Sequence, residues 1–116
     1  MKNAVEEKSF TFAVRIVNVT RELSSRGCER SLTDQLMRSG TSIGANISEA
    51  QYAQSKKDFI SKMSIALKEA SETKYWIRLL RELGNLSEED AKEYLYLAEE
   101  LIRMLIAILK SSKEES

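Results

Sequence analysis

Two long stretches of this sequence place apolar or small residues at alternating intervals of four and three positions. The first uses Phe59, Met63, Ala66, Ala70, Thr73, Ile77 and Leu80, and the second uses Ala91, Tyr94, Ala98, Leu101, Leu105 and Ile108. This spacing aligns the residues along one side of an α-helix and is typical of helices packed at a shallow left-handed angle. Because such a stripe must be covered by other helices, the pattern predicts a helical bundle.

Helix boundaries are marked by serine and glycine in a chain that contains no proline. Ser31, Ser55 and Ser87 are each followed three residues later by an aspartate, an arrangement that caps a helix N-terminus. Gly27 and Gly84 stand where a left-handed residue can close a helix. We therefore expect helices over residues 4–26, 32–53, 56–83 and 88–110, followed by a polar tail at 111–116.

The connections between these helices are short, so successive helices must lie side by side and run in opposite directions. The predicted fold is all-α, an antiparallel up-down-up-down four-helix bundle over residues 1–110. Its predicted core includes Phe59, Met63, Ala66, Ala70, Ile77, Leu80, Leu101, Leu105 and Ile108. The first helix adds two predicted core stripes, one with Phe12, Ile16, Val19 and Leu23 and one with Phe10, Ala13 and Val17.

The sequence contains no histidine, which removes many kinds of catalytic and metal site. Imidazole zinc ligands, Ser-His and Cys-His nucleophile pairs and the Glu-x-x-His motifs of di-iron bundles all need this residue. Carboxylate or Ser-Lys catalysis needs only residue types that any solvated helical surface carries, so their presence does not indicate an enzyme. We expect a protein that is not an enzyme and that uses no metal and no cofactor.

Cys28 is the single cysteine of the chain and cannot form an internal disulfide. The first residues lack the basic and then apolar pattern of a signal peptide, and both features favour the reducing cytoplasm. The longest apolar run, residues 101–109, is interrupted by Arg103 and is far shorter than the roughly 20 residues of a membrane-spanning helix. We expect a cytoplasmic protein without a membrane segment.

The same run at residues 101–109 is apolar on nearly all sides. Ile102, Ile106 and Leu109 lie on flanks of the helix that a four-helix core cannot all cover. One interpretation is a wide core-facing stripe with a stray exposed residue. We favour the other interpretation, in which the protein associates with itself through this helix.

A second unexplained feature lies in residues 38–49. Gly40 and Gly44 are poor helix formers four residues apart on one face, which indicates that some other group approaches closely there. Beside this face, polar side chains occupy successive helical turns at Arg38, Ser42, Asn46 and Glu49.

The next helix offers acidic residues that match this polar row. Glu69 and Glu72 are bracketed by apolar residues and are expected to be half-buried. Because a carboxylate taken out of water needs a partner, we expect Arg38 to pair with one of them, in a network that also contains Asn46 and Glu49. Such a network either fixes the register of the two helices, which we favour, or forms a ligand site.

Several segments together resemble a known family. They are SFTFAVRIV from Ser9, LMRSGTSIGANISEA from Leu36, SKKDFI from Ser55 and LKEASETKYWIRLLRELG from Leu67. The chain resembles the four helix bundle protein family, whose members are encoded within intervening sequences of bacterial 23S ribosomal RNA genes. The polar row at residues 38–49 carries the family's Arg-x-x-x-Ser-x-x-x-Asn-x-x-Glu pattern. Relatives often have a glycine where Ala50 stands and a proline near the end of the first loop.

The resemblance implies a homopentameric ring of four-helix bundles in a family whose biochemical role is largely unknown. A related branch, the accessory variability determinant of diversity-generating retroelements, binds its reverse transcriptase and nucleic acid through a basic surface. We expect a non-catalytic, self-assembling scaffold or adaptor.

Positive charge in this sequence gathers in residues 55–84. There Lys74, Arg78 and Arg81 lie one turn apart with Tyr75 beside them, a stripe that could contact phosphates. The whole chain is neutral, with 18 basic and 18 acidic residues, and that does not favour a nucleic-acid partner. The alternative function is therefore a nucleic-acid-binding accessory protein whose partner is RNA, DNA or a nucleic-acid enzyme.

Overall fold

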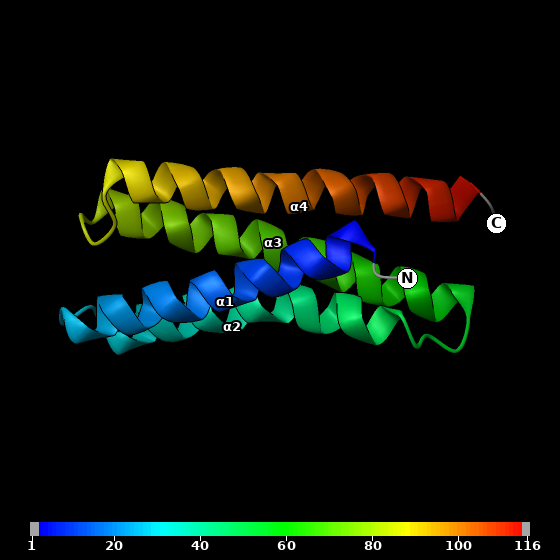
Figure 1. Ribbon diagram of the computed structural model, residues 1–116, viewed down its shortest axis with the longest axis horizontal. Helices are drawn as coiled ribbons and strands as arrows, with labels where there is room; N and C mark the ends of the chain where they lie inside the picture. Colours follow the sequence, from blue (N-terminus) through cyan, green and yellow to red (C-terminus); the bar gives the residue numbers. More distant parts are fainter. Residues whose placement is uncertain (1–2, 115–116) are drawn as a thin grey trace.

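The computed structural model describes residues 3–114 of the chain and contains four helices. They are α1 (Ala4–Ser25), α2 (Arg30–Ala50), α3 (Lys56–Glu82) and α4 (Glu88–Glu114). Successive helices run in opposite directions, and Figure 1 shows α1 and α2 as one layer beneath a second layer of α3 and α4. No strand occurs within residues 3–114. The predicted four-helix bundle is confirmed, and it measures 47 × 24 × 20 Å.

The helix ends mostly follow the predicted capping chemistry. The Ser55 hydroxyl accepts a hydrogen bond from the Asp58 amide at 3.0 Å, and the Ser87 hydroxyl accepts one from the Asp90 amide at 3.0 Å. Gly27 and Gly84 have φ angles of +88° and +84°, the left-handed conformation that closes a helix at little cost for glycine.

The predicted cap at Ser31 is wrong. Helix α2 already begins at Arg30, and the preceding residue, Glu29, makes no side-chain capping bond. The Glu29 backbone carbonyl instead accepts the amides of Leu32 and Thr33 at 3.0 and 3.2 Å. Ser31 therefore lies inside the helix, because the chain turns immediately after Gly27.

The remaining boundaries differ by a few residues from the predicted ranges. Helix α1 is capped by Asn3, whose side chain accepts the Glu6 amide at 2.8 Å. Helix α2 ends at Ala50 instead of residue 53, and α4 continues past the predicted end at residue 110 to Glu114. Residues 115 and 116 of the predicted tail lie outside the described residues.

The core follows the heptad stripes through most of the bundle. The predicted core residues that are buried are Phe12, Ile16, Val19, Leu23, Met63, Ala66, Ala70, Ile77, Leu80, Leu101 and Leu105. Helix α2 adds Leu36, Ile43 and Ile47, which are fully buried. Large side chains from every helix thus meet along one central axis.

At one end of the bundle the heptad prediction fails. Phe59 and Ile108 are only half-buried, and Leu109 is buried with 6% of its surface exposed. Phe59 and Ile108 line a hollow beside Ala4, where α1 begins. Since α1 has no further helical turn to cover these two side chains, α4 turns the next residue, Leu109, toward the core instead.

A close approach between α1 and α2 accounts for both glycines of the second helix. A Cβ atom at Gly40 would lie 2.7 Å from Ile16 Cγ2, and one at Gly44 would lie 3.2 Å from the backbone oxygen of Ser9. Real Cβ contacts of these lengths are rare or absent, so α1 can sit this close only because both positions lack a side chain. The predicted close approach is confirmed.

Helices α1 and α4 make the loosest of the four neighbouring contacts in the bundle. We call this boundary the α1–α4 seam. Two ion pairs cross it, Arg15 with Glu93 at 2.6 Å and Lys8 with Glu100 at 3.4 Å. Charged side chains therefore bridge helices that meet less closely than the other neighbours.

Candidate functional site

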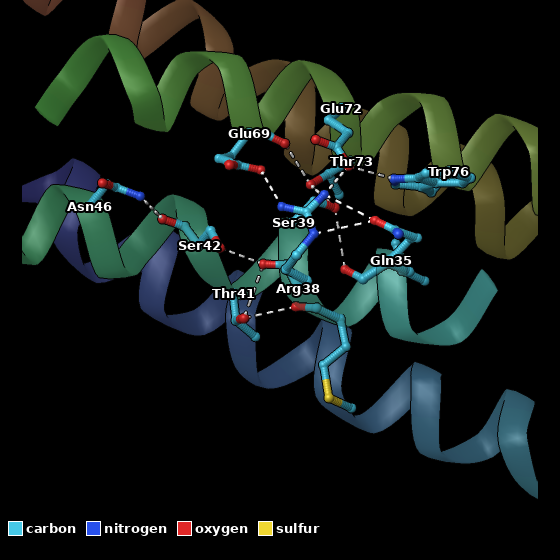
Figure 2. Close-up of polar contacts among 12 residues, drawn as sticks. Gln35, Arg38, Ser39, Thr41, Ser42, Asn46, Glu69, Glu72, Thr73 and Trp76 are labelled. Carbon is cyan, nitrogen blue, oxygen red and sulfur yellow. Dashed lines mark hydrogen bonds and ion pairs between the residues drawn. The ribbon is translucent and has the colours of Figure 1, made fainter. Parts of the chain in front are cut away.

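The polar side chains of α2 and α3 meet around Arg38. Its guanidinium donates to Glu69 Oε1 at 3.1 Å through Nη1 and to the Glu72 carboxylate through Nη2. Nε and Nη2 also donate to Gln35 Oε1, at 3.3 and 3.1 Å. Figure 2 shows the guanidinium lying between these acceptors, so the predicted pairing of Arg38 with the third helix is present.

Trp76 extends this group of side chains along α3. Its indole Nε1 donates to Glu72 Oε2 at 2.9 Å. The Trp76 ring also contacts the Tyr75 ring edge to face, with centroids 5.0 Å apart. We call Gln35, Arg38, Glu69, Glu72 and Trp76 the Arg38 cluster.

The Arg38 cluster is half-buried. The exposed fractions of the side chains are 46% for Arg38, 30% for Glu72 and 16% for Glu69. An ion pair at this depth is screened less by water than a surface pair, yet avoids the full desolvation cost of a buried one. Each carboxylate in the cluster accepts a hydrogen bond from the Arg38 guanidinium.

Beneath the cluster, a pair of buried hydroxyls joins the same two helices. Thr73 Oγ1 lies 3.0 Å from Ser39 Oγ and 2.8 Å from the Glu69 carbonyl oxygen. Both residues are buried with no measurable exposure. Thr73 belongs to the predicted core stripe of this helix, whereas no sequence pattern predicts a role for Ser39, because a small hydroxyl residue in a helix gives no periodic signal of its own.

Part of the predicted network is wrong. The Asn46 side chain donates to the Ser42 carbonyl at 2.8 Å, and the Ser42 hydroxyl donates to the Arg38 carbonyl at 2.6 Å. As Figure 2 shows for Asn46 and Ser42, these bonds stay within α2. Glu49 pairs instead with Lys62 at 2.9 Å, which raises the pKa of that lysine. Only Arg38 of the predicted row reaches Glu69 and Glu72.

The bonds of the Arg38 cluster join α2 to α3, and we call a cluster that holds two helices in one register a clamp. Every buried side-chain polar atom within residues 3–114 has a hydrogen-bond partner. These described residues also contain no group of three acidic, histidine or cysteine side chains that could hold a metal ion. A cluster whose donors and acceptors already satisfy one another is suited to fixing helix register.

Two side chains at the α1–α4 seam, Arg15 and Tyr94, have raised pKa values. The hydrogen bond that Arg15 donates to the Glu93 carboxylate raises the pKa of Arg15, so this guanidinium stays charged. Burial raises the pKa of Tyr94, whose ring lies 5.1 Å from the Arg15 guanidinium carbon. Arg15 thus contacts both the carboxylate and the aromatic face of α4.

The predicted basic stripe on α3 is not a row of free cations. Lys74 pairs with Glu99 of α4 at 3.2 Å. Arg78 is exposed and Arg81 is half-buried, and within the described part of the chain neither forms an ion pair. Arg81 lines a hollow together with Glu88 and other residues of α4. Positive and negative side chains therefore lie side by side around Lys74 and Arg81, and the electrostatic potential there is not uniformly positive.

The residues predicted to form an oligomer contact divide into two groups. Ile106 is 51% exposed and Ile102 is half-buried, whereas Leu109 belongs to the core. Leu109 was therefore wrongly placed among the exposed flanks. Phe10, predicted to be core, is instead 70% exposed, because the close approach of α1 to α2 turns it outward.

No helix within residues 3–114 is long and apolar enough to cross a membrane. Among known proteins, the family model of the 23S rRNA-intervening sequence protein matches residues 1–107 of this chain. No curated protein matches it.

A solved structure is closely similar to this chain. It is the 1.70 Å crystal structure of a protein with unknown function from the S23 ribosomal protein family of Bacteroides thetaiotaomicron. The two share 47% sequence identity, and the match covers 92% of this chain and 99% of the other, with a TM-score of 0.90.

Proposed function

The chain belongs to the 23S rRNA-intervening sequence protein family, and we propose that it is a non-catalytic scaffold whose copies assemble head to tail into a homopentameric ring. The observation that carries this proposal is a pair of exposed apolar faces on different sides of the bundle. One face is on α1 and the other is on α4.

The face on α1 is centred on Phe10 and Val14, which lie one turn apart and are 70% and 46% exposed. Phe10 borders a hollow that it shares with Gly44 and Ser48 of α2. This face therefore points outward over the layer of α1 and α2, and it offers both a protruding ring and a recess beside it.

The face on α4 is centred on Ile106, with Ile102 one turn before it. Glu99, two turns before Ile106 on the same side of the helix, bonds to Lys74 of α3. Ile106 therefore points outward over the layer of α3 and α4, away from the face on α1.

Two different faces on one protomer favour a heterologous contact, in which the α1 face of one copy meets the α4 face of the next. Each such contact rotates one copy relative to the copy before it. When the successive rotations add up to a full turn, the last copy meets the first and the assembly is a closed ring. The number five comes from the family resemblance, and the placement of the two faces supports the head-to-tail arrangement.

A scaffold role fits the chemistry of the described residues. The Arg38 cluster is internally satisfied and the acidic groups of residues 3–114 do not converge as metal ligands. The polar row at residues 38–49 is bonded within the bundle, which leaves the outer faces for contact with other molecules.

The proposal is tested by multi-angle light scattering at micromolar protein concentration. We expect wild type to have the mass of five chains, and Phe10→Glu or Ile106→Glu to reduce it to one, because a buried charge opposes association. Tyr52→Glu, a change at an exposed residue between α2 and α3, is the matched control and should leave the mass unchanged. A monomeric wild type would overturn the proposal.

A further inference from the structure

The α1 face that carries Phe10 is bordered by two carboxylates. Glu6 and Glu7 lie one turn before Phe10, and both line the hollow that Phe10 shares with Gly44 and Ser48. Glu7 is exposed and Glu6 is half-buried, and neither forms an ion pair within residues 3–114. We call Glu6 and Glu7 the acidic rim.

The described cations of α1 do not cancel the acidic rim. Lys8 turns toward α4 and pairs with Glu100 at 3.4 Å. Arg21 is exposed and lies eleven residues beyond Phe10, which is about 16 Å along the helix. The acidic rim therefore gives the surface around Phe10 a negative potential.

The α4 face that carries Ile106 is bordered by two cations. Arg103 lies one turn before Ile106 and Lys110 one turn after it, and both side chains are exposed. Neither forms an ion pair with another described residue. Of the carboxylates on this side of α4, Glu99 is bonded to a lysine of α3, and Glu114 lies at the end of the helix, about 12 Å beyond Ile106. We call Arg103 and Lys110 the basic rim.

We propose that the two rims select which faces meet when copies of this chain assemble: the acidic rim of one copy pairs with the basic rim of the next. This inference rests on the head-to-tail assembly proposed above and adds the feature that selects it. Two α1 faces brought together would place four carboxylates in one contact, and two α4 faces would place four cations there. Like charges in contact oppose both symmetric dimers, whereas the contact between unlike faces neutralises both rims.

The hollow enclosed by the acidic rim receives Ile106 of the next copy. Its volume is about 400 Å³, and Gly44, which has no side chain, forms part of its wall beside the Phe10 ring. Ile106 protrudes from α4 with 51% of its surface exposed. An apolar side chain seated in a recess and surrounded by polar groups is the usual centre of a protein contact. The apolar pair thus supplies affinity, and the surrounding charges supply the choice of partner.

The test reverses each rim alone and then both together, and it measures assembly by sedimentation velocity over a dilution series. The variants Glu6→Lys with Glu7→Lys, and Arg103→Glu with Lys110→Glu, should each need at least about a tenfold higher concentration to assemble than wild type. The quadruple variant exchanges the two rims and should assemble within about threefold of wild type. Wild type should assemble more weakly at about 500 mM than at about 50 mM salt, because salt screens the rims.

The matched control is Glu88→Lys with Glu89→Lys, which makes the same charge change at two exposed residues in the first turn of α4. It should assemble like wild type. If wild type is pentameric but the double variants dissociate no more readily than this control, the inference is overturned and the assembly proposal stands. The inference is also overturned if the quadruple variant stays dissociated while circular dichroism shows it fully helical. A monomeric wild type would overturn both proposals.

Discussion

Arginine joins neighbouring helices at two places in this bundle, and the two places are built differently. Between α2 and α3, Arg38 bonds to Gln35, Glu69 and Glu72 above a buried pair of hydroxyls. Across the α1–α4 seam, Arg15 bonds to Glu93, whose side chain is 53% exposed. At the first junction the acidic partners are mostly covered, with Glu69 16% and Glu72 30% exposed, whereas at the second the acidic partner lies at the surface.

This difference indicates which contacts set the geometry of the fold. A half-buried cluster over a buried hydroxyl pair penalises any shift of α2 along α3, because a shift leaves polar atoms unpaired. A rim ion pair can follow a small movement at little cost. The helices of the looser seam, α1 and α4, are also the ones that present Phe10 and Ile106 outward.

The largest effect in this comparison is expected from Thr73→Val, which keeps the side-chain shape and removes the hydroxyl. Ser39 would then have only the Leu36 carbonyl, at 3.5 Å. We expect urea unfolding to show a loss of about 2 kcal/mol, the cost of a poorly paired buried polar group. Adding Ser39→Ala should restore most of this loss, and a double variant no more stable than the single one would contradict the role of the pair.

Arg38→Ala should have the next largest effect. It leaves Glu69 and Glu72 half-buried without their cation, so we expect a loss of about 1 to 2 kcal/mol, between the values for exposed and buried pairs. Arg30→Ala is the matched control, because Arg30 forms an exposed ion pair with Asp34 at 3.7 Å. If urea unfolding gives equal losses for the two variants, the Arg38 cluster is not a clamp.

At the seam, Arg15→Ala should lower the free energy of unfolding by less than about 1 kcal/mol. The loss should shrink further at about 1 M salt, where screening acts over about 3 Å. The loss in Arg38→Ala should respond less to salt because its partners are shielded. If Arg15→Ala lowers the free energy of unfolding as much as Arg38→Ala does, and if salt changes the two losses equally, the two junctions do not differ in the way described.

The smallest expected effect is a pH dependence at the seam. Burial raises the pKa of Tyr94 above that of an unfolded tyrosine, so the unfolded chain releases this proton first. Its contribution to stability is present below about pH 10 and is lost as pH rises through the folded pKa. Tyr94→Phe should therefore lose less stability than wild type between about pH 8 and about pH 11, measured by urea unfolding.

Sequence alone predicted the parts of the fold that depend on periodic burial. The heptad stripes of α3 and α4, the serine caps at Ser55 and Ser87 and the closing glycines all act within one helix, so their signals are local. Ser31 carried the same capping signal, but the short turn before it started the helix earlier. The failures at Phe59 and Ile108 arose because the starting point of a different helix decides how well they are covered.

The candidate site shows the same division. The spacing of Arg38, Glu69 and Glu72 was sufficient to predict that they meet, since half-buried charges require partners. Asn46 and Glu49 share the same row, yet one bonds within its own helix and the other to Lys62. The bonding choice of a long or flexible polar side chain depends on distances across the interface, which helical periodicity does not determine.

The central claim, head-to-tail assembly through the α1 and α4 faces, is tested most directly by mixing two variants. Phe10→Glu keeps an intact α4 face and Ile106→Glu keeps an intact α1 face, so neither assembles alone but each can contact the other once. Sedimentation velocity should show monomers in the separate samples and a one-to-one heterodimer in the mixture. A mixture that stays monomeric, or single variants that remain fully assembled, would contradict the account.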